Sequence, residues 1–313
     1  MHINCLGGVD GTCAIHPAPA PEAVLFPNRP TRPEMTPLEV EIWQTYIWEK
    51  SGLFFTPSRL YFLGQRLWER IQQLKLASYT EYYHYVVYNN NGAAEWLLLL
   101  DSLLNNETSF FRHEPSFNAL RELALPELVQ QKRRQGVSNL HVWSAGCSAG
   151  QEPYSLAMTL LEHMEARLWQ LRVMGSDISR GKLAQARLGQ YKQHEVRYMP
   201  PYYLNKYLRW VQTAEGAHYQ VVERVRELVQ FGYLNFKEPE SYWIHGQDII
   251  FCQNVLIYFK PDHRLEIVKL LIERLNPGGF LFLAPAEMVG LRMPGVTFVN
   301  APDALVYRKT TMI

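Results

Sequence analysis

The residues best suited to chemistry begin with a run of small side chains between Ser144 and Gly150, in the sequence SAGCSAG. An apolar run precedes it, and a helical pattern opened by Glu152 and Pro153 follows. Small residues such as Gly146 let a ligand approach the backbone closely, and the first N–H groups of a helix are unpaired donors. The spacing is neither GxGxxG nor a Gly-Lys-Ser/Thr loop. It therefore predicts a nucleoside ligand with a small anion rather than a pyrophosphate.

Further polar residues end the apolar runs downstream. Asp177 closes the run VMGS, where a carboxylate can accept from both hydroxyls of a ribose or can simply cap the next helix. Gln253 and Asn254 close the run DIIFC, and Tyr258 follows as either a core or a catalytic residue. Asn235 ends the run before it in the same way and is a candidate for contact with an adenine edge.

The stretch NETSFFR forms a fourth polar group, placing Asn106 and Thr108 before two phenylalanines and Arg112. A loop of this kind needs hydrogen-bond partners for its polar groups once it is buried. We interpret it either as an interdomain hinge with an aromatic plug or as a lid whose Arg112 reaches an anion in a cleft.

Strand and helix patterns alternate from about residue 105 onwards. Strands are expected at 140–144, 171–176, 228–234, 248–253, 279–285, 296–299 and 304–308. Helices are expected at 152–168, 179–189, 200–211 and 261–275. This alternation predicts an α/β doubly wound sheet, whose ligands bind at the carboxyl ends of the strands.

The part before residue 105 has a different pattern. Residues 1–35 are rich in proline and predict an extended or disordered arm. Residues 36–104 predict a small helical domain, in which Thr36 and Glu39 form a capping box. The α/β domain then covers 105–313, with a small β insert around 212–230.

Composition excludes several functional classes. The net charge of +1 over 313 residues gives no footprint for nucleic acid. The four cysteines lack metal-ligand or disulfide spacing, which predicts no metal site and a reducing compartment. No apolar run is long enough to insert in a membrane and no signal peptide is evident, so we expect a cytoplasmic protein.

Six motifs in this order resemble the CheR family, the chemotaxis-receptor glutamate O-methyltransferases. They are NETSFFR, WSAGCSAGQEPYSLA, DIS, ARLGQY, NVLIYF and LNPGGFLFL. The resemblance covers roughly residues 40 to 308. It implies a class I S-adenosylmethionine-dependent methyltransferase sheet behind a small helical domain. It also implies transfer of methyl groups to glutamates on the cytoplasmic helical region of a methyl-accepting chemoreceptor.

The resemblance also implies roles for individual residues. Arg112 and Tyr258 would lie beside the transferred methyl group and position the acceptor glutamate, and Arg66 and Arg70 would face the receptor. The cofactor site implied by the resemblance and the polar strand ends comprises Asn106, Thr108, Arg112, Gly146, Glu152, Asp177, Asn235, Phe236, Gln253 and Asn254.

Two departures from the family pattern leave alternatives open. The turn that usually reads Gly-His-Ser-Glu is APAE here, which retains Glu287, and the residue before the pocket asparagine is Gln253 instead of arginine. One alternative is an S-adenosylmethionine-binding regulator of a chemosensory system that lacks catalysis. Another is a class I methyltransferase with a different acceptor.

Overall fold

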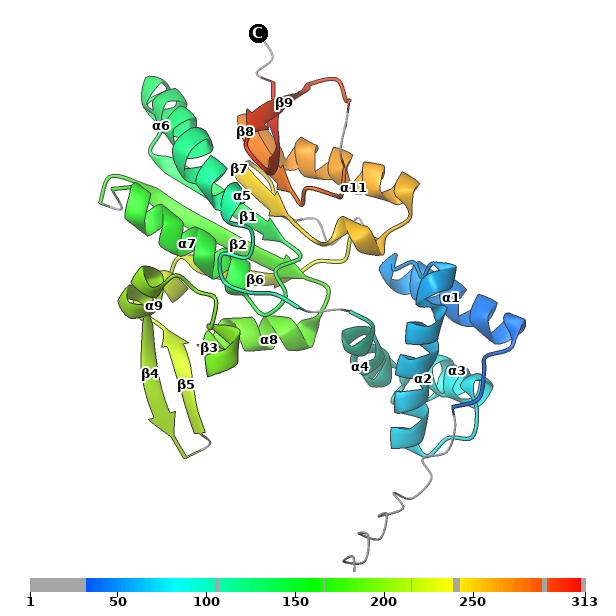
Figure 1. The fold of residues 1–313 in the computed structure, drawn as a ribbon. Helices are drawn as coiled ribbons and strands as arrows, with labels where there is room; N and C mark the ends of the chain where they lie inside the picture. Colours follow the sequence, from blue (N-terminus) through cyan, green and yellow to red (C-terminus); the bar gives the residue numbers. More distant parts are fainter. Residues whose placement is uncertain are drawn as a thin grey trace, which may run out of the picture. The chain divides into compact units, whose positions relative to one another are not determined.

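The computed structural model describes residues 32–104, 107–165, 167–214, 216–238, 243–288 and 292–310. Figure 1 shows a helical part early in the chain and an α/β part after it. The proline-rich arm expected at 1–35 lies almost wholly outside the described residues.

Four α-helices and a short 3-10 turn make up the described part of the helical domain. They are α1 (Pro37–Ser51), η1 (Pro57–Arg59), α2 (Leu60–Leu74), α3 (Tyr79–Tyr88) and α4 (Gly92–Leu103). The predicted capping box is present, because Thr36 Oγ1 accepts from Glu39 N and the Glu39 carboxylate accepts from Thr36 N. Leu63, Leu67 and Ile71 form the buried stripe of α2 and pack in one core with residues of the other helices.

A seven-stranded sheet forms the centre of the α/β domain, in the order β6-β2-β1-β7-β8-β10-β9. Its strands are β1 (Asn139–Ala145), β2 (Gln170–Asp177), β6 (Val229–Tyr233), β7 (Gln247–Cys252), β8 (Leu275–Leu283), β9 (Val296–Ala301) and β10 (Ala304–Lys309). The first five run parallel, and β10 pairs antiparallel with β8 and β9. The chain moves outward from β1 through β2 to β6 and then returns to β7 on the other side of β1. The strand order therefore switches between β1 and β7, where a ligand crevice is expected.

Helices cover both faces of this sheet, as Figure 1 shows for α7 and α11. Residues of α5 (Glu114–Ala119), α6 (Leu125–Arg134) and α7 (Gln151–His163) form one core with one face of the strands. Residues of α11 (Pro261–Arg274) form a second core with the opposite face. Consecutive residues of β1 point to opposite faces and show this division, since Val142 belongs to the first core and Trp143 to the second.

The chain segment between α8 (Arg180–Leu188) and β6 forms a second, smaller sheet, whose strand order is β3-β5-β4. It consists of β3 (Gln190–Tyr191), β4 (Leu208–Thr213) and β5 (Gly216–Val221), with α9 (Pro201–Tyr207) before β4 and α10 (Glu223–Arg226) after β5. The helix expected to continue to residue 211 thus ends at Tyr207. The next six residues pair antiparallel with β5, a partner that local periodicity does not reveal. The sheet also starts earlier in the chain than the insert expected around 212–230.

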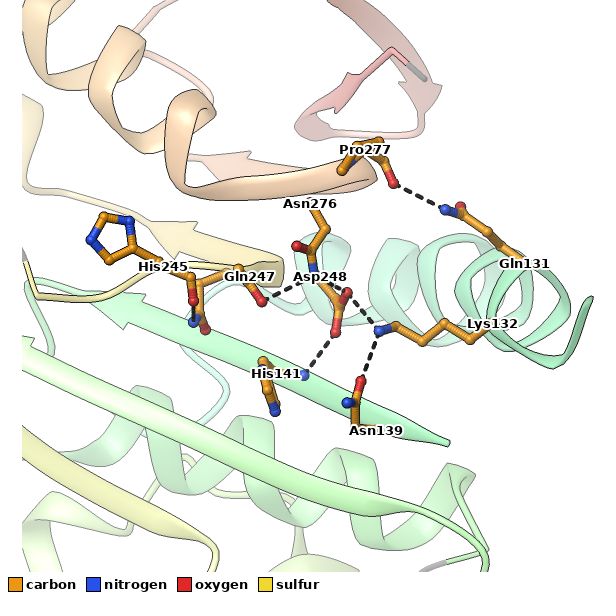
Figure 2. A network of polar contacts seen from close by, with 10 residues as sticks. Gln131, Lys132, Asn139, His141, His245, Gln247, Asp248, Asn276 and Pro277 are labelled. Carbon is orange, nitrogen blue, oxygen red and sulfur yellow. Dashed lines mark hydrogen bonds and ion pairs between the residues drawn. The ribbon is translucent and has the colours of Figure 1, made fainter. Parts of the chain in front are cut away.

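A buried polar network fastens the amino ends of the parallel strands, as Figure 2 shows. Lys132 Nζ lies 2.9 Å from Asp248 Oδ1 and donates to Asn139 Oδ1 at 3.1 Å. The Asp248 carboxylate also accepts from His141 N and from Asn276 Nδ2. Together these contacts tie α6 to the starts of β1, β7 and β8. The opposite, carboxyl edge of the sheet is left for a ligand.

Candidate functional site

A deep pocket opens at the carboxyl edge of the sheet, above the switch between β1 and β7. Its hollow measures about 1140 Å³ including the space open to solvent at the mouth. Leu53 and Leu104 of the helical domain close one side of it. The predicted site residues that line it are Thr108, Arg112, Gly146, Glu152, Asp177, Phe236, Gln253, Asn254 and Tyr258.

Asp177 is held in place by backbone donors. Its Oδ2 accepts from Ser148 N at 2.8 Å and its Oδ1 accepts from Ser179 N at 2.9 Å. Burial raises the pKa of Asp177, and these two backbone hydrogen bonds oppose that shift. Each carboxylate oxygen has a further lone pair, so Asp177 can still accept from two hydroxyls of a ligand. Ser179, and not Asp177, caps α8 through its own side chain.

Glu152 lies in the first turn of α7 and faces the pocket. Its Oε1 accepts from Ser144 Oγ at 2.6 Å. Burial raises the pKa of Glu152 to about 7, while the bond from Ser144 and the nearby charge of Arg112 pull it down and Glu287 pushes it up. A carboxylate that is costly to desolvate gains most from a cationic partner, such as the amino group of an amino-acid ligand.

The glycine turn packs directly against the loop that follows β7. Gly146 has φ +87, and a Cβ at this position would lie 2.2 Å from Val255 Cγ2, so only glycine fits there. The turn is also fastened to β2, since the N–H groups of Gly146 and Cys147 both donate to Ser176 O. This close packing leaves the backbone at 146–148 as the floor of the pocket.

Glu287 organises the loop after β7, a role that its position in the altered APAE turn did not reveal. Its carboxylate accepts from the N–H groups of Asn254, Ala284 and Ile257 at 3.2, 3.1 and 3.4 Å. Burial raises the pKa of Glu287, and the backbone donors oppose the shift. Asn254 has φ +60, a strained conformation that this carboxylate helps to hold.

Arg112 and Tyr258 reach the pocket from different sides. Arg112 Nη1 donates to Glu107 O at 2.8 Å, which leaves most of the guanidinium donors for a ligand as far as the described residues go. Tyr258 O accepts from Phe54 N at 2.8 Å, and its ring lies under the guanidinium of Arg59 at 5.4 Å. The helical domain therefore positions the tyrosine loop, while the 107–112 segment positions the arginine.

Two of the predicted cofactor residues make hydrogen bonds to other parts of the protein, and a third is not described by the structure. The Asn235 side chain is buried outside the pocket lining, and its amide donates to Lys50 O and Glu238 Oε1. Gln253 lines the pocket, but its Nε2 donates to Ser116 Oγ and Leu283 O. Asn106 lies outside the described residues. Asn235 thus ties the helical domain to the strand edge, and Gln253 braces α5 against β8.

The two arginines predicted to face a receptor differ in their surroundings. Arg70 forms a two-pronged pair with the buried Glu95, at 2.8 and 2.7 Å, and Tyr82 Oη donates to the same carboxylate. Arg66 pairs with Glu69 on the surface of α2, with a side chain 36% exposed. The structure thus places Arg70 within the helical domain and Arg66 at its surface.

Two further residues, at or just before the start of α7, were not among the predicted site residues, and of these only Ser148 lines the pocket. Ser148 lines the pocket with its Oγ buried and without a partner in the described part of the chain. Gln151 is 2% exposed, and its Oε1 is likewise unpaired there. Their only signal in the sequence was their place in the small-residue turn and at the start of α7.

The described residues contain no group of His, Cys, Asp or Glu side chains that could hold a metal ion. A membrane-crossing helix is also missing from the described ranges, because no helix there is both long and apolar enough.

Comparison with known proteins gives matches along most of the chain. The profile of the CheR methyltransferase all-alpha domain matches residues 38–104, and that of the CheR methyltransferase SAM binding domain matches residues 106–301. Chemotaxis protein methyltransferase 2 of Vibrio cholerae is 34% identical over 247 residues, which is 78% of this chain and 83% of that protein. Chemotaxis protein methyltransferase 1 of Pseudomonas aeruginosa is 30% identical over 277 residues, which is 86% of this chain and 97% of that protein. With both domains matched in order and the pocket at the expected sheet edge, the chain belongs to the CheR family of S-adenosylmethionine-dependent methyltransferases.

Proposed function

We propose that this protein transfers a methyl group from S-adenosylmethionine to glutamate carboxylates in the cytoplasmic region of a chemoreceptor. The observation that carries the proposal is that Arg112 and Tyr258 line the same pocket as Glu152 and Asp177. One pocket thus combines acidic groups suited to the cofactor with a guanidinium and a phenol suited to a carboxylate acceptor. The relatives are named as chemotaxis protein methyltransferases, and the CheR resemblance implies a chemoreceptor as the acceptor.

The pocket fits S-adenosylmethionine on its own features. Asp177 has acceptor capacity for ribose hydroxyls, and Glu152 offers a desolvated carboxylate to a cationic amino group. The unpaired Oγ of Ser148 adds a group that needs a ligand partner. Phe236 gives the pocket a flat apolar side for a purine ring.

When bound, S-adenosylmethionine supplies a methyl group already activated by its sulfonium. A glutamate carboxylate is already anionic at neutral pH, so the protein needs no general base for the acceptor. Its task is to orient that carboxylate and to strip water from it. The Arg112 guanidinium can hold one carboxylate through paired N–H donors. The Tyr258 hydroxyl can direct one oxygen without adding charge.

How tightly Arg112 binds the acceptor carboxylate affects the rate of methyl transfer. An arginine that bound the free carboxylate too tightly would stabilise the ground state and slow transfer. The bond from Arg112 to Glu107 O holds the guanidinium at the pocket wall and restrains how closely it follows the acceptor.

The test is a methylation assay with the full chain, methyl-labelled S-adenosylmethionine and cytoplasmic fragments of chemoreceptors encoded in the same genome. Label released as volatile methanol by mild alkali identifies a carboxyl ester. We expect base-labile label with the wild type and a decrease of roughly 10²–10³-fold for Arg112→Ala. Tyr258→Phe should decrease the rate without weakening cofactor binding. Arg133→Ala, an exposed arginine of α6, is the matched control and should leave the rate unchanged.

Two other results would point to other functions. Tight cofactor binding with no base-labile label on any receptor fragment would contradict the transferase proposal and favour a non-catalytic regulator. Alkali-stable label would instead indicate a different acceptor atom.

A further inference from the structure

A second hollow lies beside the cofactor pocket and shares one wall with it. This side groove measures about 860 Å³ including its mouth. Its lining consists of Glu107, Thr108, Ser109, Arg112, Ala149, Gln151, Lys182, His194, Glu195, Arg197 and Tyr198. The first four residues also line the cofactor pocket. The 107–112 segment therefore separates the two spaces, and Arg112 borders both.

The acidic and basic side chains in the side groove differ in whether they already have partners. Glu195 is already satisfied, because its carboxylate accepts from Gln185 Nε2 at 3.2 Å and from Lys192 N at 2.8 Å. Lys182, Arg197 and Arg112 have no ion pair within the described ranges. Three cationic side chains thus face two carboxylates, those of Glu107 and Glu195, in the described lining, so the groove has an excess of positive charge. An acidic occupant would complement this surface.

Gln151 adds a feature that a simple anion would not use. Its side chain is 2% exposed and lines the groove, yet its Oε1 accepts no hydrogen bond in the described part of the chain. A buried acceptor without a donor is costly, so a ligand that brings an N–H group is favoured here. A polypeptide carries both such N–H groups and acidic side chains, whereas a small phosphate or carboxylate carries no donor of this kind.

The outer rim of the groove is prepared for a carboxylate. Tyr198 is 71% exposed, and the Arg197 guanidinium lies 4.5 Å from the centre of its ring. Stacking on the ring restrains a long side chain whose planar donors match a carboxylate in pairs.

We propose that the side groove binds an acidic segment of the methyl acceptor, next to the glutamate that enters the cofactor pocket. This inference rests on the proposed function, since it takes the acceptor to be a protein carboxylate. Lys182 and Arg197 hold acidic side chains of that segment, and Gln151 accepts from one of its N–H groups. Arg112, at the shared wall, then meets the acceptor glutamate itself.

Charge reversal tests the groove. The double variant Lys182→Glu/Arg197→Glu is compared with Arg134→Glu/Arg172→Glu, which makes the same charge change at two exposed arginines outside the groove. Methylation kinetics with the receptor fragments give KM, fluorescence anisotropy gives the fragment Kd, and calorimetry gives the Kd for S-adenosylmethionine. We expect the groove variant to raise KM and the fragment Kd about tenfold and to lose much of the salt dependence. Cofactor affinity should not change, and the control should match the wild type.

Gln151→Leu gives an independent test, because it removes an unpaired buried acceptor. We expect about a fivefold rise in KM for the fragment with no decrease in the midpoint of thermal unfolding. If the groove variant methylated the fragment at the wild-type rate and with an unchanged KM, the proposal that the side groove binds the acceptor would be overturned. The transferase proposal would still stand. Fragment binding that depends on the groove charges, without base-labile methylation, would overturn the transferase proposal and leave the groove as a receptor-binding surface.

Discussion

Replacing Glu152 by glutamine should stabilise the protein while weakening its hold on the cofactor. Burial raises the pKa of Glu152 from 4.5 to about 7. Because this acid has a higher pKa when folded, the folded state binds its proton more tightly, and stability falls as the pH rises from below 4.5 to above 7. At about 1.4 kcal/mol per unit, the ionised carboxylate costs about 3 kcal/mol at pH 8 and under about 1 kcal/mol at pH 5.

Glutamine keeps the shape of the side chain, and its Oε1 can still accept from Ser144 Oγ. We therefore expect Glu152→Gln to raise the free energy of unfolding by up to about 3 kcal/mol at pH 8, and much less at pH 5. Loss of a charge-assisted hydrogen bond should weaken S-adenosylmethionine binding at pH 8 by roughly 10–100-fold. In the wild type, binding should release a proton near pH 7, since a cationic ligand lowers the pKa of the carboxyl.

Urea unfolding followed by circular dichroism at pH 5 and pH 8 measures the first effect. Calorimetry of cofactor binding in buffers of different ionisation enthalpy measures the affinity and the proton release. Glu227→Gln, at an exposed glutamate away from the pocket, is the matched control. An equal change in stability at both pH values would show that packing, rather than charge, accounts for the effect. Unchanged cofactor affinity would refute the assignment of Glu152 to the ligand.

Three further substitutions separate structural from functional roles. Lys132→Met leaves the buried Asp248 carboxylate at the amino edge of the sheet without its cationic partner. Urea unfolding should therefore show a free energy of unfolding lower by about 3–5 kcal/mol, with unchanged cofactor affinity in the folded protein. Glu287→Ala removes the acceptor of three backbone N–H groups around the tyrosine loop, so the methylation rate should drop about 10²-fold. Arg70→Ala leaves the buried Glu95 without its cationic partner and with only the Tyr82 hydroxyl as a donor, so it should cost about 3–5 kcal/mol of stability, whereas Arg66→Ala should cost under about 1 kcal/mol. Similar losses for both arginines would contradict this difference in burial.

Much of the fold could be predicted because its signals are local or follow from topology. The alternation of strands and helices fixes a parallel sheet, and parallel strands bring their carboxyl ends to one edge. Asp177 ends β2, whereas Asn254 and Tyr258 both follow β7, yet this rule alone is enough to place them around one pocket. The capping box at Thr36 is equally local, since both of its hydrogen bonds lie within four residues.

The rest depended on partners far along the chain. Asn235 ends a strand just as Asp177 does, but its amide reaches Lys50, which is 185 residues away. Glu287 organises a loop some 30 residues earlier. Neither contact follows from spacing, because each depends on how the helical domain and the last strands pack onto the sheet edge. The same limit explains why β4 was expected to continue a helix.

The helical domain affects the chemistry as well as the fold. Leu53 and Leu104 complete the pocket wall, and the N–H of Phe54 holds the loop that bears Tyr258. In the proposed reaction the acceptor glutamate loses its negative charge, so a wall that excludes water favours the less charged product side. That same desolvation raises the pKa of Glu152. A site built to neutralise a carboxylate on its substrate must therefore also hold carboxylates of its own at a cost in stability, which hydrogen-bond donors offset in part and the bound cofactor would offset further.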